Sequence, residues 1–236
     1  MGTDSLSATR NGYTLVAEEP GQSGGISFTI TGPDGKPVTD FVNEQTEPMH
    51  LYLVRSDLTG FQHVHPTAVG DGSWTAPITA PSPGDYRLYT QVIPRSAEKN
   101  GAIVLSVPVS VAGSGKDSAA PLPPAAASAT AGEFGVAVAG TATSGSQSRL
   151  ALTITRNGSP ETALQPYLQS FAHVTAIHEG DLALSHLHPV GGAATGNGGP
   201  TVDVEAMFDQ PGNYRMFVQF QVDSQLETVP ITIAVS

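Results

Sequence analysis

Histidine supplies the most chemically suggestive pattern in this sequence. Six of the seven histidines form two triplets with the spacing His-x12-His-x-His, and the second triplet repeats the first 123 residues further on. Three neutral imidazoles suit Cu(II), Zn(II) or Ni(II) and suit Ca(II) or Mg(II) poorly. We therefore expect one metal site per triplet, with copper the first expectation and zinc or nickel the alternatives. The expected ligands are His50, His63, His65, His173, His186 and His188.

The triplets lie inside an internal duplication. Four sequence blocks recur in the same order, two of them at an offset of 123 residues and one, Phe28–Thr31 with Leu152–Thr155, at 124. The fourth, Pro83–Tyr89 with Pro211–Phe217, recurs at an offset of 128, so the second copy has gained five residues, most simply within Gly191–Gly199. The histidines stay in register while the residues between them change. This comparison within one chain favours a shared role for the histidines over incidental placement.

Strand geometry shows how the spacing could gather the three rings. If Met49–Arg55 and Phe61–His65 form a hairpin, Leu53 pairs with Gln62 and Tyr52 with His63. His50 then lies opposite His65 and diagonal to His63, with all three on one face of the sheet. The same arithmetic pairs His173 with His188. A register shift of one residue would move His50 to the other face, so the observed register tests the prediction directly.

Each copy reads as about seven short strands in about a hundred residues, which is typical of an immunoglobulin-like sandwich. Residues common in turns separate the strands. Tyr86 and Tyr214 fit a tyrosine corner, and they fit the role of ordinary core aromatics equally well. We expect domains at residues 8–112 and 133–236, joined by an Ala/Pro/Ser-rich linker at 113–132. The expected strands of the first copy are Tyr13–Glu18, Gly25–Thr31, Met49–Arg55, Phe61–His65, Ser73–Thr79, Tyr86–Val92 and Ile103–Val111; those of the second run from Phe134–Ala139 to Val229–Val235.

Composition excludes several classes of protein. The 236 residues carry a formal net charge of −11 with only ten basic side chains, so nucleic acid is not an expected partner. No apolar run approaches the roughly 20 residues of a membrane helix. The absence of cysteine excludes disulfides, thiolate zinc sites and a blue-copper centre. The N-terminus lacks the basic region and apolar core of a signal peptide. This is compatible with a mature chain whose signal peptide has been removed.

Other polar residues near the triplets are weaker candidates. His178 aligns with Arg55 and reads as a surface residue near a turn. Glu47, Asp71 and Glu179 could complete a coordination sphere or orient an imidazole, but they do not repeat between the copies. Met49 aligns with Ala172, so a thioether site common to both copies is not expected.

The segment Met49–Leu58, followed by Gly60–Pro66 and Pro83–Arg87, resembles small bacterial β-sandwich domains of the YtkA-like and cupredoxin-like groups. The resemblance covers most of residues 25–111 and, more loosely, 150–235. It implies tandem immunoglobulin-like or cupredoxin-like sandwiches, a role in handling copper or another heavy metal, and a secreted or envelope-anchored location. A metal-handling envelope protein is the partner it implies.

Two alternatives remain open. The first is a structural or adhesive module of the cell envelope in which the histidines are incidental. The second is a three-histidine metalloenzyme, because zinc with an open fourth position can activate water. The sequence shows no motif for a proton relay or a substrate pocket, so we expect a non-enzymatic binding protein.

Overall fold

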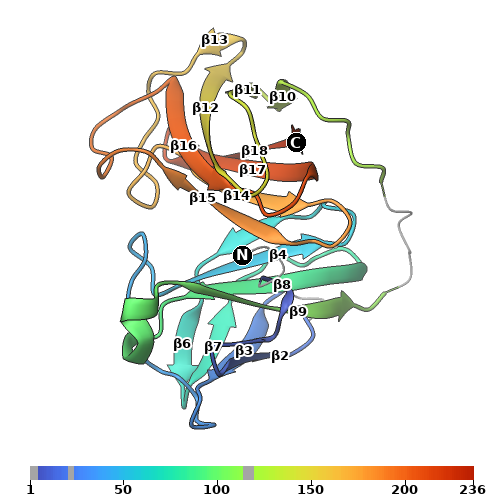
Figure 1. Cartoon of the computed structure of the whole chain (residues 1–236), viewed down its shortest axis with the longest axis vertical. Coiled ribbons are helices and arrows are strands. Elements are labelled where there is room, and N and C mark those ends of the chain that lie inside the picture. Colours follow the sequence, from blue (N-terminus) through green and yellow to red (C-terminus); the bar gives the residue numbers. More distant parts are fainter. Residues whose placement is uncertain (1–4, 21–23, 114–119) are drawn as a thin grey trace. The chain divides into compact units, whose positions relative to one another are not determined.

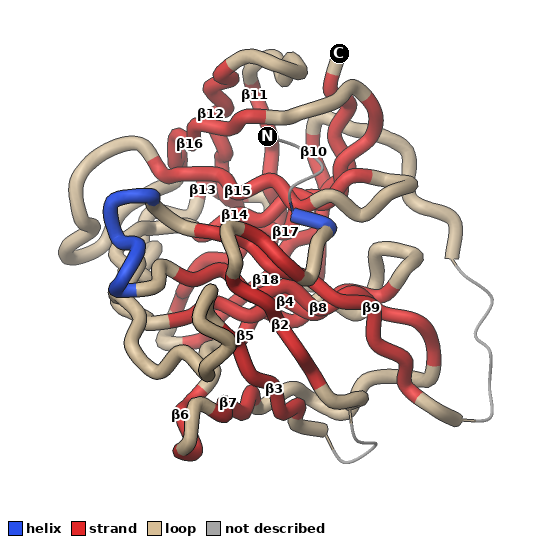
Figure 2. Tube along the Cα trace, turned by 60° about the horizontal axis from the view of Figure 1, so that its bottom comes forward, coloured by secondary structure: helices blue, strands red, loops and turns tan. Residues whose placement is uncertain are grey.

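The computed structural model describes residues 5–20, 24–113 and 120–236, apart from the side chain of His186 (Figure 1). These residues divide into two compact units, the first ending at Pro121 and the second beginning at Leu122. Strands dominate both units (Figure 2), so the predicted all-β class is confirmed. No helix among the described residues is long and apolar enough to cross a membrane.

The first unit is a sandwich of two antiparallel sheets, with strand orders β1-β2-β3-β7-β6 and β5-β4-β8-β9. Alternate residues of both sheets, such as Phe28, Ile30, Leu51, Leu53 and Leu88, are buried in one core. Its elements are β1 Thr9–Arg10, β2 Tyr13–Ala17, β3 Ile26–Thr31, β4 Met49–Arg55, β5 Gln62–Val64, β6 Thr67–Gly70, β7 Ser73–Ala76, β8 Gly84–Val92, the 3₁₀ helix η2 Arg95–Asn100 and β9 Ile103–Val111.

The second unit forms one continuous antiparallel sheet with the order β10-β11-β12-β16-β15-β14-β17-β18, and β13 pairs with β12. Strand β15 joins the two halves of this sheet, because it pairs with β14 as far as Leu187 and with β16 from Leu187 onward. Both halves supply side chains to one core. The strands are β10 Ser128–Ala131, β11 Phe134–Ala139, β12 Gln147–Arg156, β13 Ser159–Pro160, β14 His173–His178, β15 Leu184–Pro189, β16 Thr201–Met207, β17 Gly212–Val222 and β18 Gln225–Val235.

Both units contain the predicted tyrosine corner. The hydroxyl of Tyr86 donates a hydrogen bond to the carbonyl oxygen of Ser82 at 2.9 Å, and that of Tyr214 donates to Gln210 at 3.1 Å. In each case the acceptor lies four residues upstream, so the hydroxyl ties the turn to the start of β8 or β17. The aligned Pro-Gly-Asp/Asn-Tyr blocks therefore build the same corner twice.

The predicted end of the linker is wrong. Ser128–Ala131 form β10, which pairs with β11 through a turn at Gly132. This strand lies at the edge of the sheet and is made of small residues, so it has no apolar alternation to reveal it. The short strands β1, β6 and β13 were also not predicted, and all four residues of β6 are exposed. Part of the predicted linker, residues 114–119, lies outside the described residues.

Candidate metal centre

The hairpin of β4 and β5 has the predicted register. Tyr52 pairs with His63 and Leu53 with Gln62, as the spacing requires. His50 and His63 therefore project from the same face of the sheet, while His65 follows directly after β5. The register of the second copy is also as predicted, because Thr175 pairs with His186 and Val174 with Leu187.

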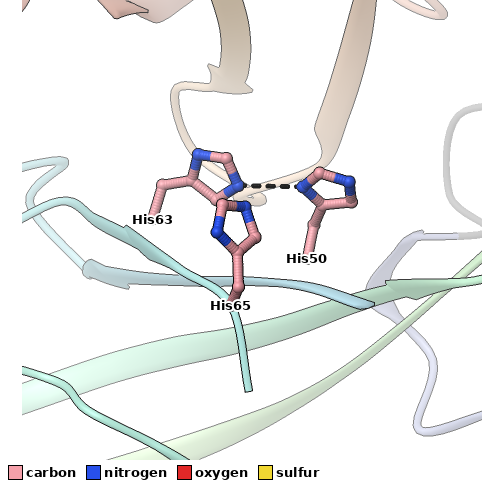
Figure 3. A group of neighbouring side chains, drawn as sticks. All are labelled: His50, His63 and His65. Atoms are coloured by element: carbon pink, nitrogen blue, oxygen red, sulfur yellow. Dashed lines mark hydrogen bonds between the residues drawn. The ribbon is translucent and has the colours of Figure 1, made fainter. Parts of the chain in front are cut away.

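The three histidines of the first unit come together. Their rings turn towards one another (Figure 3), with centroids separated by 5.3 Å for His50 and His63, 5.1 Å for His50 and His65, and 4.9 Å for His63 and His65. One ring nitrogen of each lies within 4.8 Å of the other two. His50 and His63 are buried, and His65 is half-buried.

These distances suit a small transition-metal ion. Two imidazoles on one tetrahedral ion, bound at 2.0–2.1 Å, hold their ligand nitrogens about 3.3 Å apart. His50 Nδ1 and His63 Nε2 are already 3.1 Å apart. The third nitrogen lies within 4.8 Å of the other two and needs to move by about 1.5–2 Å at most to complete a three-nitrogen cap. Side-chain rotation can supply such a movement.

The hydrogen bonds around His50 fix which nitrogen faces the group. His50 Nε2 lies 3.0 Å from the carbonyl oxygen of Glu44, which can only accept, so Nε2 carries the proton. In the neutral ring Nδ1 is then an acceptor, and His63 Nε2–H donates to it. His65 Nε2 is buried without a hydrogen-bond partner. The group therefore holds one buried nitrogen whose bonding capacity is unmet.

Burial keeps the rings of His50 and His65 neutral. Burial lowers the pKa of His50, although the Glu44 carbonyl and the charges of Glu44 and Glu47 act in the opposite direction. Burial, with repulsion from His50, lowers the pKa of His65 to about 4. Neutral imidazoles are the form that binds metal, so these two rings stay able to bind an ion in mildly acidic solution.

The ring nitrogens of the three histidines are the main ligand atoms that this group offers. Tyr52 stacks on His63, with ring centroids 4.6 Å apart and planes inclined by 20°. Met49 is fully buried and belongs to the core on the other face of β4. Its thioether is therefore directed away from the histidines.

Two site residues were missed by the sequence interpretation. Glu44 contributes a backbone carbonyl, which any residue type can supply. Gln91 is buried and donates from Nε2 to Glu44 Oε2 at 2.7 Å. A signal for Gln91 was present, because Gln219 aligns with it at the offset of 128 residues.

The three acidic residues named from the sequence have different surroundings. Glu47 shares a turn with Glu44 and acts on His50 through its charge. Asp71 is exposed in the turn between β6 and β7. Glu179 accepts a hydrogen bond from the side-chain amide of Asn213 at 3.0 Å. None of the three belongs to the metal-capable group found among the described residues.

The second triplet stays a prediction. His173 is buried at the start of β14, and His188 is exposed on β15, where it pairs with Glu205 of β16. The side chain of His186 lies outside the described residues, so its place relative to the other two is not described. The structure thus assembles the first triplet and leaves the second undecided.

His178 was wrongly read as a surface residue. Its side chain is 13% exposed, and its Nδ1 lies 2.7 Å from Asp181 Oδ1. Gln210 Nε2 donates to the other oxygen of Asp181 at 2.6 Å. His178 therefore occupies the place that Arg55, which pairs with Asp57 at 3.3 Å, holds in the first unit. Both pairs stabilise the turn of their hairpin.

Fold and site together define a duplicated β-sandwich chain with a three-histidine group in its first unit. The chain belongs to the family DUF8832, a domain of unknown function, whose model matches residues 8–108 and again residues 129–236. Among curated proteins, none matches the sequence.

Solved structures give distant similarities. Invasin, a bacterial integrin-binding protein, is 15% identical with a TM-score of 0.27, over 98% of this chain and 41% of that one. The D00-D0 domain of intimin is 10% identical with a TM-score of 0.28, over 95% and 99%. A putative membrane anchored protein from Corynebacterium diphtheriae is 12% identical with a TM-score of 0.26, over 96% and 59%. The fold description therefore rests on the strands and cores of this chain.

Proposed function

We propose that this protein is a non-enzymatic metal-binding protein that holds an ion with His50, His63 and His65. The observation that carries the proposal is the group itself, in which three ring nitrogens lie within 4.8 Å of one another and His65 Nε2 is buried without a partner. An unpaired buried polar group costs about 1–3 kcal/mol, and a bound ion would remove that cost.

The proposed ion is copper, with zinc or nickel as alternatives. Neutral imidazoles without thiolate or thioether ligands suit Cu(II), Zn(II) and Ni(II). The resemblance to copper-handling sandwich domains favours copper among the three. It also supports an extracytoplasmic location and a role in scavenging, buffering or delivery, with a metal-handling envelope protein as donor or recipient.

One observation favours a structural role for the histidines instead. The hydrogen bond between His50 and His63, together with the one to Glu44, satisfies both nitrogens of His50 without an ion. An adhesive or spacer module could use such a cluster to hold its sheet face. In that case the histidines would contribute to stability and not to binding.

Metal titration of the full chain separates the two roles. We expect the metal-free protein to bind Cu(II) and Zn(II). The His63→Ala variant should lose the metal ion that the native chain binds most tightly. His178→Gln removes a histidine from outside both triplets and should retain it. Unchanged binding in His63→Ala would overturn the proposed site, and an absence of binding to Cu(II), Zn(II) and Ni(II) would support the structural role. Turnover of carbon dioxide or superoxide by the loaded protein would contradict the non-enzymatic role.

A further inference from the structure

His50 occupies a middle position in its sheet. Strand β4 lies between β5, which carries His63, and β8, which carries Gln91. Gln91 is the cross-strand partner of His50 and is 3% exposed. The other histidines therefore approach His50 from one flank, and Gln91 lies on the opposite flank.

A chain of hydrogen bonds connects Gln91 to His50 through Glu44. Gln91 Nε2 donates to Glu44 Oε2 at 2.7 Å, and the carbonyl oxygen of the same Glu44 accepts from His50 Nε2 at 3.0 Å. Because a carboxylate can only accept, the amide nitrogen of Gln91 must face it. The side chain of Gln91 thus anchors the residue whose backbone holds His50.

The segment that carries this carbonyl is a tight turn. Glu44 and Glu47 exchange two backbone hydrogen bonds, of 2.8 and 3.1 Å, across Gln45 and Thr46. Both of these central residues have positive φ, at 49° and 79°, a conformation that is unfavourable for side-chain-bearing residues. An anchor on Glu44 opposes relaxation of the turn.

The second unit repeats this turn with a different residue at the anchored position. Tyr167 and Ser170 exchange the equivalent backbone hydrogen bonds, and Leu168 and Gln169 have positive φ. Gln219 again pairs across the strand with His173. Tyr167 therefore stands where the first unit has Glu44, so the carboxylate that accepts from Gln91 belongs to the first unit only.

Taking the three-histidine metal site as given, we propose that Gln91 and Glu44 are its positioning residues. Gln91 holds the Glu44 turn, the Glu44 carbonyl retains the proton on His50 Nε2, and Nδ1 is thereby left as the ligand atom of His50. Hydrogen bonds of this kind orient metal-binding imidazoles and fix their tautomer. His50 thus binds the ion through the nitrogen that already faces His63.

Zn(II) affinity of the full chain tests the positioning role. We expect Gln91→Met and Glu44→Ala each to weaken Zn(II) binding about 10- to 100-fold, the usual effect of losing an outer-shell partner. Glu47→Ala is the matched control, because it removes the same charge from the same turn. Glu44→Gln keeps an acceptor oxygen for Gln91, so its Zn(II) affinity should equal that of Glu47→Gln.

The proposal is overturned if Gln91→Met binds Zn(II) as the native chain does, or if Glu44→Ala is no weaker than Glu47→Ala. Gln62→Met controls for the substitution itself, because Gln62 lies on the neighbouring strand and bonds to the backbone of Thr79. It should leave the affinity unchanged.

The tautomer of His50 in the metal-free protein provides a second readout, which a merely structural effect would not change. Long-range proton–nitrogen spectra should show the Nε2–H form in the native chain and a mixture of forms in Gln91→Met. An unchanged tautomer in Gln91→Met overturns the proposal. If the native chain binds none of Cu(II), Zn(II) and Ni(II), the proposed function fails, while the tautomer still decides whether Gln91 and Glu44 hold His50.

Discussion

At the scale of single residues, the three histidines of the first unit have different hydrogen-bonding states. His50 is held on both nitrogens, His63 donates to it, and His65 Nε2 is buried without a partner. A purely structural cluster would be expected to satisfy its buried polar groups. The unmet nitrogen therefore favours the proposed ion site over a closed hydrogen-bond network.

The depressed pKa of His65 predicts a loss of stability in mild acid. In the unfolded chain His65 takes up a proton near pH 6.5, whereas in the folded protein burial and His50 lower its pKa to about 4. The unfolded state therefore binds more protons between these values, so the stability that the neutral ring contributes is present above pH 6.5 and is lost as the pH falls towards 4. Urea unfolding of the metal-free protein at pH 7.5, 5.5 and 4.5 should show this decline.

The comparison that isolates this residue is His65→Gln, whose stability should fall less over the same interval. Carboxyl groups titrate in both proteins and cancel in the difference. The lowered pKa values of Asp57 and Asp181 act below their usual value of 3.8, outside the interval. Parallel pH profiles for the native protein and His65→Gln would contradict the assignment.

At the scale of elements, the sequence contains enough to predict strands β4 and β5 and their register. The two-residue period of a strand brings His50 and His63 to one face in only every second register, and the structure has one of these registers. The Glu44 turn was not predictable in this way, because it acts through a backbone carbonyl and two left-handed residues of no special type. Strand β10 was not predictable from the sequence either, because small residues at a sheet edge show no hydrophobic periodicity.

A glycine beside the His178–Asp181 pair is expected to be sensitive to substitution. Gly212 has φ of 139°, and a Cβ atom placed on it would lie 2.7 Å from His178 Nε2. Gly212→Ala should therefore displace His178 from Asp181 and destabilise the protein by about 1–3 kcal/mol. Chemical denaturation measures the change in the free energy of unfolding.

Gly180→Ala is the matched control for this substitution. Gly180 also has positive φ, at 105°, but a Cβ atom on it would meet nothing within 4 Å. It should show the backbone strain without the clash and lose less stability than Gly212→Ala. Equal losses would mean that contact with His178 does not matter.

At the scale of the whole molecule, the chain contains two copies of one β-fold that differ in their polar residues. Each unit has its own hydrophobic cluster, and the two clusters share no residue. The duplication was visible in the sequence because apolar and turn residues recur at fixed offsets. How far the polar positions had diverged was less visible: Tyr167 replaces Glu44, Ser170 replaces Glu47, and His178 replaces Arg55.

This divergence predicts two unequal classes of metal site. The first triplet has two carboxylates in the turn beside His50, and their negative charge favours a bound cation. The corresponding turn of the second unit carries Tyr167 and Ser170, and His188 is exposed on β15. Titration of the full chain with Zn(II) should therefore be biphasic, with His63→Ala removing the tight phase and His186→Ala the weak one. Two equal sites, each removed by one of these variants, would show that the carboxylates beside His50 do not set the affinity.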